Sequence, residues 1–176
     1  MRSPSKAALA CVVFLGAWAA HSAWALSSDR NQPMHIEADQ VSIDDQKEVS
    51  VYRGHVIVTQ GSLRITSDTL TVYSKQQQID HMVAIGNPAT YRQRPDHKDQ
   101  DVQAHARRME YYARQDRVVL IDDAHLLQGG NTFVSKRIDY NLRTDQVQAG
   151  AKGGGDRVRI VIQPPPPKSG KTAPKK

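Results

Sequence analysis

The sequence has 176 residues, with 24 lysines and arginines against 18 aspartates and glutamates, and a formal net charge of +6. Six of the basic residues and none of the acidic ones lie in residues 1–25 and 163–176, so residues 26–162 are neutral and lack the basic patch of a nucleic-acid-binding domain. The single cysteine, Cys11, lies in the first of these segments, which excludes disulfides, thiolate metal sites and a cysteine nucleophile from residues 26–162.

The first 25 residues predict a cleaved secretory signal peptide. Arg2 and Lys6 provide a positive start, residues 7–20 form an apolar run, and Ala23 and Ala25 fit the small-x-small pattern of a cleavage site. The apolar run is shorter than the roughly 20 residues that a helix needs to cross a bilayer. The alternative interpretation is an uncleaved membrane anchor formed by the same residues.

Residues 34–43 predict the first β-structure of the chain. Met34 and Ile36 alternate with His35 and Glu37, the pattern of a strand with one face in a core and one face in water. The alternation changes phase at Asp39, after which the apolar positions continue on a new face. We expect residues 26–162 to form one β-domain that begins with this strand.

The pattern of this stretch recurs three times. Copies begin at Ile36, Ile65, Ala104 and Phe133, and each reads apolar, any, small, charged, any, apolar, any, apolar. The steps between copies are 29, 39 and 29 residues, so the first and third copies, like the second and fourth, lie 68 residues apart. A fixed long period predicts that one β-unit is used repeatedly along the chain.

Glycine and proline punctuate the rest of the chain. A break in alternation at Gly54 predicts a β-bulge, and residues 79–91 predict two short strands around Gly86 and Pro88. Residues 150–156 are rich in glycine and predict a hinge before a last strand at residues 157–162.

Turn signals about every 8–12 residues predict about 11 to 17 short strands and no helix. The expected class is therefore all-β, as a sandwich, roll or barrel whose interior is lined mainly by Val, Ile, Leu and Met. Residues 163–176 contain four consecutive prolines and four lysines without apolar periodicity, and they predict a disordered tail.

The candidate reactive residues do not form a catalytic or metal site. Asp44 with Asp45, and Asp122 with Asp123, are sequence neighbours that point to opposite faces of a strand and that turns favour for backbone reasons. There is no nucleophile elbow and no phosphate-binding loop before a helix. The sequence predicts no enzyme, no metal and no cofactor. Six of the seven histidines lie in residues 26–162 and stand singly, without the spacing of a metal pair, at positions 35, 55, 81, 97, 105 and 125.

Three motifs resemble the OstA-like family. They are Gln-Pro-Met-His-Ile-Glu-Ala-Asp-Gln at residues 32–40, Gly-His-Val-Ile-Val-Thr-Gln-Gly at 54–61 and Gly-Asn-Pro-Ala-Thr-Tyr at 86–91. The resemblance covers residues 32–162. It implies an antiparallel β-jellyroll of many short strands, folded like a slightly open taco around an apolar interior, with no catalytic residue and no cofactor.

The resemblance also implies a function. A periplasmic protein of this kind binds lipopolysaccharide, shields its lipid A acyl chains, and joins an inner-membrane-anchored OstA-like relative to the amino-terminal domain of the outer-membrane lipopolysaccharide translocon. Copies also stack head-to-tail. The inward-phase apolar residues of the matched motifs are the expected lipid groove: Met34, Ile36, Val56, Val58, Ile65, Tyr91, Met109 and Tyr111. The expected subunit edges carry Met34, Ile36, Val158 and Ile160.

Two other interpretations fit the residues. A structural periplasmic adaptor would join its partners by strand edges around a solid core, without a lipid ligand. A membrane-anchored relative would share the fold but retain residues 1–25 as an anchor. Co-purification of lipopolysaccharide tests the first alternative, and the mass of the mature N-terminus tests the second.

Overall fold

The computed structural model of the protein describes residues 29–95, 98–150 and 157–164. The predicted signal peptide, residues 151–156 of the predicted hinge and residues 165–176 of the predicted tail lie outside the described residues. The described part contains ten strands in one sheet and two short 3-10 helices. Among these residues, no helix has the length and apolarity needed to cross a bilayer. The elements, in order, are η1 (Asp29–Asn31), β1 (His35–Glu37), β2 (Gln40–Asp44), β3 (Val49–Gln60), β4 (Leu63–Lys75), β5 (Gln78–Gln93), β6 (Val102–Tyr112), η2 (Ala113–Gln115), β7 (Arg117–Gln128), β8 (Asn131–Asn141), β9 (Gln146–Ala149) and β10 (Arg159–Val161).

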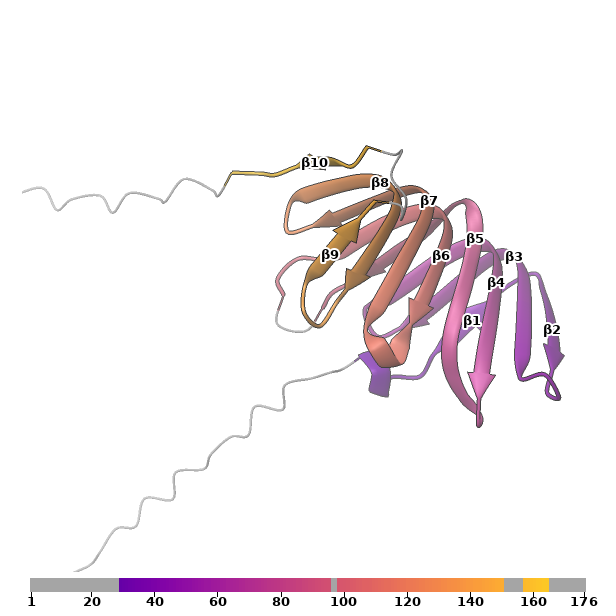
Figure 1. The fold of residues 1–176 in the computed structure, drawn as a ribbon. Helices are drawn as coiled ribbons and strands as arrows, with labels where there is room; N and C mark the ends of the chain where they lie inside the picture. The colour runs from indigo at the N-terminus through magenta and orange to yellow at the C-terminus, as the bar shows by residue number, and fades with distance from the viewer. Residues whose placement is uncertain (1–28, 96–97, 151–156, 165–176) are drawn as a thin grey trace, which may run out of the picture.

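The sheet is an antiparallel meander with divided edges. Strands β3 to β8 pair in sequence order, while β1 and β2 both pair with β3, and β9 and β10 both pair with β8. The strands therefore stack side by side, with the N-terminal edge at one end and the C-terminal edge at the other (Figure 1). The all-β, antiparallel class predicted from the sequence is confirmed.

The predicted number of strands was wrong, because bends within strands resemble turns in the sequence. Strands β3 to β8 are each 11 to 16 residues long. Residues 79–91, predicted as two strands, lie within the single strand β5, whose register against β6 shifts between Ile85 and Ala89. A bulge interrupts alternation as a turn does, but the chain does not reverse.

The predicted bulge at Gly54 is confirmed and belongs to a line of bends across the sheet. The β3–β4 register shifts between Arg53 and Val56, and Gly54 has a φ of +79°. Each following pair, from β4–β5 to β7–β8, has its own shift near mid-strand. This line divides the sheet into two arms. We call the half that carries β1 and β10 the first arm, and the half that carries β2 and β9 the second arm.

The sequence repeat coincides with this bend. The second, third and fourth copies lie on β4, β6 and β8, and their small residues Ser67, Ala106 and Ser135 are buried at the bend. A small side chain is needed there because the two arms converge. In the first copy the strand is divided at the bend into β1 and β2, and the Asp39 N–H donates a hydrogen bond to the Gly54 carbonyl at 3.1 Å.

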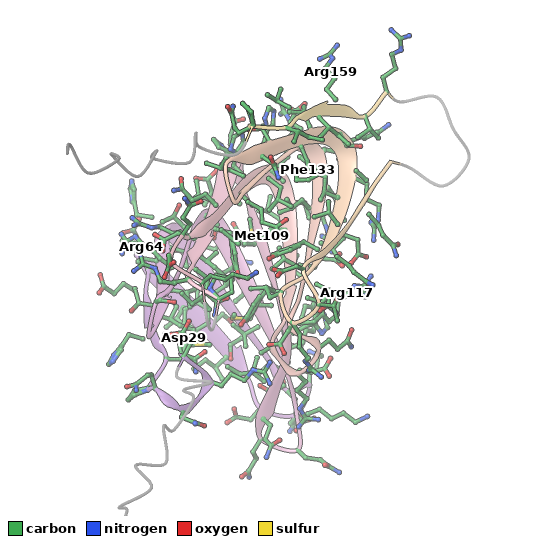
Figure 2. The ribbon with its side chains drawn as sticks, turned by 90° about the vertical axis from the view of Figure 1, so that its left-hand side faces the viewer. Asp29, Arg64, Met109, Arg117, Phe133 and Arg159 are labelled. Atoms are coloured by element: carbon green, nitrogen blue, oxygen red, sulfur yellow. The ribbon has the colours of Figure 1, made fainter. Side chains whose placement is uncertain are left out.

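The two arms fold onto each other around one core. Tyr111 pairs with Met82, and Tyr91 lies nine residues further along β5, which in a flat sheet would place it about 30 Å away. The ring centroids of Tyr91 and Tyr111 are nevertheless only 6.2 Å apart. Figure 2 shows Met109 in the middle of the molecule, with Arg64 and Arg117 at its two sides. The fold is thus a bent roll with its core between the arms.

Candidate functional site: the apolar interior and the sheet edges

Apolar rows cross the interior from one sheet edge to the other. In each row, neighbouring residues come from paired positions on adjacent strands, so their side chains lie on the same face of the sheet. The row of the first arm consists of Ile36, Val58, Ile65, Tyr91, Ala104, Leu126, Phe133 and Ile160. The row of the second arm consists of Val41, Tyr52, Leu70, Ala84, Met109, Leu120, Ile138 and Ala149.

The structure places all eight residues of the predicted lipid groove in this interior. Met34 and Ile36 are partly buried and pack against the central cluster. The other six, Val56, Val58, Ile65, Tyr91, Met109 and Tyr111, belong to that cluster and are at most 4% exposed. The predicted residues therefore form one apolar lining, and in this closed form their own side chains fill the space between the arms.

The interior contains hydroxyl groups but no buried charge among the described residues. The buried polar side chains there are Ser67 and Ser135, together with the hydroxyls of the core tyrosines. The Tyr91 hydroxyl donates a hydrogen bond to Gln93 Oε1 at 2.5 Å. Burial raises the pKa of Tyr111 to about 12, so this side chain is neutral under ordinary conditions. Such a lining suits hydrocarbon.

The four predicted edge residues lie at the two opposite edges of the sheet. Met34 and Ile36 belong to the β1 edge, and Val158 and Ile160 to the β10 edge. Ile160 is 52% exposed although it continues the first-arm row, because no strand among the described residues covers the outer side of β10. Exposed apolar side chains beside unpaired backbone groups favour pairing with another chain. The role of these residues in assembly stays a prediction.

Two further edge residues were missed in the sequence. Val41 and Ile43 on β2 are 58% and 61% exposed, although both occupy inward positions. The repeat contains the signal that finds them, because they correspond to Leu70 and Val72 of the second copy, which are buried. An inward position without a covering neighbour indicates an edge.

The candidate reactive residues have structural roles. Asp44 accepts hydrogen bonds from the backbone N–H and the Nζ of Lys47 at 3.0 and 2.6 Å, as expected in a turn. Asp123 lies at the bend with a φ of +51° and pairs with Arg107 at 2.5 Å, a hydrogen bond that lowers the pKa of Asp123. Within the described residues, no group of three histidine, cysteine or carboxylate side chains is arranged to hold a metal ion.

Comparisons with known proteins agree with this architecture. The lipopolysaccharide export system protein LptH of Pseudomonas aeruginosa is 42% identical over 150 residues, which are 81% of this chain and 85% of LptH. The lipopolysaccharide export system protein LptA of Escherichia coli K12 is 36% identical over 144 residues, covering 81% of this chain and 77% of LptA.

A solved structure and a family model point to the same family as these relatives. The crystal structure of the P. aeruginosa LptH, described as the LptA homologous periplasmic component of the conserved lipopolysaccharide transport device, matches with a TM-score of 0.73 at 39% identity. The match covers 78% of this chain and 99% of that chain, and it confirms the predicted β-jellyroll class. The family model described as LptA/(LptD N-terminal domain) LPS transport protein matches residues 35–146. The chain therefore belongs to the family of LptA and the LptD N-terminal domain, whose members are lipopolysaccharide transport proteins.

Proposed function

We propose that the protein is a periplasmic bridge that binds lipopolysaccharide, shields its lipid A acyl chains between the two arms, and carries it from the inner to the outer membrane within a trans-envelope complex. The observation that carries this proposal is the pair of uncharged apolar rows that run from the β1–β2 edge to the β9–β10 edge. The protein acts as a binding and transfer component and not as an enzyme.

The energetics of an acyl chain explain why such a lining is needed. Exposing a chain of about a dozen methylenes to water costs about 10 kcal/mol, at about 0.8 kcal/mol per CH₂. Each lipid carries several chains, so unaided crossing of an aqueous space is negligible. An interior with few hydrogen-bonding groups removes most of this cost without holding the ligand in one place, which suits a ligand that must move on.

Within this proposal, the acyl chains contact the predicted groove residues. Ile36 and Met34 lie at the open end of the first-arm row, and Met109 and Tyr111 lie at the centre of the second arm. The sugars and phosphates would remain outside, because the buried interior offers them no charged partner.

The sheet edges supply the proposed partner contacts. If β1 and β2 of one copy pair with β10 and β9 of the next, the row that ends at Ile160 continues into the row that starts at Ile36, and the exposed Val41 and Ile43 become covered. The same edges suit the inner-membrane-anchored relative and the amino-terminal domain of the outer-membrane translocon. An unbroken lining would thereby cross several subunits.

Photo-crosslinking in cells tests the proposal. A photoreactive residue at Ile36, which faces inward on β1, should give an adduct with lipopolysaccharide, whereas the same residue at the neighbouring outward Glu37 should not. Equal signals at the two positions, or no lipopolysaccharide adduct at Ile36, would reject the lipid-binding function. The adaptor alternative predicts that Ile36 gives no lipopolysaccharide adduct while the sheet edges still pair with the partner proteins.

A further inference from the structure

The closed interior raises the question of where a ligand enters. Six predicted groove residues are at most 4% exposed, so an acyl chain reaches them only if the arms separate. The bend joins the arms along one side, and the strand ends lie along the other. We call the ends of the first arm, around Ser62, Lys98 and Gln128, the first rim. The ends of the second arm, around Asp116 and Asp145, form the second rim.

Polar contacts tie the two rims together. Lys98 Nζ lies 2.5 Å from Asp145 Oδ2, and Gln128 Nε2 donates a hydrogen bond to Asp145 Oδ1 at 3.1 Å. A second ion pair joins Arg30 of η1 to Asp116, which follows η2.

The segment that carries Arg30 is itself attached to the first rim. Asp29 accepts hydrogen bonds from the Ser62 hydroxyl at 2.6 Å and from Gln93 Nε2 at 2.7 Å. We call the line along which the two rims meet the seam. Both cations of these two ion pairs belong to the first rim, and both carboxylates belong to the second rim.

The two sides of the seam are not equivalent when it opens. Asp116 keeps a second partner on its own rim, Arg143, at 3.0 Å, and Asp145 keeps the Tyr140 hydroxyl at 3.1 Å. Burial alone would raise the pKa of Asp145, but hydrogen bonds from Lys98, Tyr140 and Gln128 outweigh it and hold that pKa below its usual value. Each carboxylate thus keeps a polar partner on its own rim after the rims part.

Among the described residues, neither cation has a second carboxylate partner. The side chain of Arg30 forms an ion pair only with Asp116 and that of Lys98 only with Asp145, and these side chains are 40% and 47% exposed. Half-exposed ion pairs contribute little to stability, so they exchange partners readily. Arginine and lysine bind phosphate, as they bind carboxylate, by charge-assisted hydrogen bonds.

We propose that the seam between the rims is the entry site for an acylated, phosphorylated glycolipid, and that Arg30 and Lys98 exchange their carboxylate partners for its phosphates as the rims part. This inference rests on the proposed function. It assigns the acyl chains to the interior and the phosphates to the first rim, so that the charged part of the ligand need not enter the core.

A reversible tether tests the opening of the seam. Lys98→Cys and Asp145→Cys would be combined in a Cys11→Ser background and joined with a bis-methanethiosulfonate cross-linker, which a reducing agent releases. Binding of fluorescent lipopolysaccharide should be lost in the tethered protein and return after reduction. A matched tether between Gln103→Cys and Leu127→Cys, paired and exposed on the outer face of the first arm, should leave binding unchanged.

The outcomes separate this inference from the proposed function. Equal binding by the tethered and the reduced protein would overturn the entry site while leaving lipid binding intact. Failure of the reduced and the untreated wild-type proteins to bind would reject the proposed function itself. Loss of binding in the tethered control as well would show that cross-linking blocks binding wherever it is placed, and it would also overturn the assignment of the entry site to the seam.

Charge variants test the exchange of partners. Arg30→Gln with Lys98→Gln should abolish the preference for phosphorylated lipid A over the same lipid treated with phosphatase. Arg53→Gln with Arg64→Gln removes the same charge from exposed outer positions and should preserve that preference. Asp145→Asn, which frees Lys98, should accelerate uptake about two- to fivefold. An unchanged preference in the Arg30 and Lys98 variant, or slower uptake by Asp145→Asn, would overturn the exchange.

Discussion

Asp29 accepts hydrogen bonds from the backbone N–H and the hydroxyl of Ser62, 33 residues later, at 2.7 and 2.6 Å. This contact ties the segment that precedes β1 to the turn between β3 and β4, and it thereby positions the first edge strand. Asp29→Ala should lower the free energy of unfolding by about 1–2 kcal/mol, because it leaves several donors without their acceptor. Urea unfolding measures the change. Asp45→Ala, at an exposed turn, should cost less than about 0.5 kcal/mol, and equal losses in the two variants would contradict the role of Asp29.

The bend at Gly54 predicts that replacing this glycine by alanine costs more stability than the same substitution at Gly129. A Cβ on Gly54 would lie 2.1 Å from Asp39 Oδ2, whereas a Cβ on Gly129 would meet no atom within 4 Å, and both residues have positive φ. Gly129→Ala pays only the backbone strain, about 1 kcal/mol, while Gly54→Ala should cost about 1–2 kcal/mol more because Asp39 must move. Thermal unfolding of the two variants distinguishes these costs, and a smaller loss for Gly54→Ala would refute the argument.

Equivalent positions of the repeat should differ in their contribution to stability. Leu70 and Val41 occupy the same place in two copies, but Leu70 is fully buried and Val41 is 58% exposed at the edge. Leu70→Ala should destabilise the protein by about 2–5 kcal/mol through the cavity that it leaves. Val41→Ala should cost less than about 0.5 kcal/mol, as surface substitutions do. Similar free energies of unfolding for the two variants would show that β2 is covered in solution.

Val41 should instead control the association of one copy of the protein with another. Val41→Asp places a charge where the β2 edge is proposed to meet another copy, so it should prevent concentration-dependent association without lowering the unfolding midpoint. Sedimentation velocity over a range of protein concentrations measures this effect. Ser42→Asp, on the outward face of the same strand, is the control and should associate like the wild type. Association of Val41→Asp at wild-type strength would place the interface elsewhere.

The rim contacts predict a dependence of stability on pH. The pKa of Asp145 is lowered in the folded protein, so its ionised form contributes stability that is present above the pKa of the unfolded chain, about 4, and is lost as pH falls through the folded value. Wild type should therefore exceed Asp145→Asn in stability at pH 7, and the difference should be smaller at pH 3. Urea unfolding at the two pH values measures it, and a difference that stays constant or grows on acidification would contradict the sign.

Local patterns in the sequence predicted much of the interior. Alternation over a few residues identified the inward positions of Val58, Ile65 and Met109, and the interruption at Gly54 identified a bulge. These features depend on neighbouring residues along one strand, and the side-chain period of two is a property of the local backbone. The all-β class and the inward phase of these residues could therefore be predicted from the order of the residues alone.

The number of strands and the exposure of the edges could not be predicted in this way. A bend and a chain reversal both interrupt alternation, so the signals in residues 79–91 did not distinguish one bent strand from two. Val41 and Leu70 have equivalent sequence contexts, and only the presence or absence of a covering strand separates an exposed edge from a buried core. Exposure is a property of the assembled sheet.

The ion pairs at the seam show most clearly how local features differ from features that depend on the whole fold. Sequence alone established an uncharged apolar β-interior, because side-chain polarity and alternation are local properties. Folding of the sheet across its bend placed Lys98 against Asp145 and Arg30 against Asp116, pairs that lie far apart along the chain. Such charges pair only after both arms have formed, since a long-range contact depends on the path of the whole backbone between its partners.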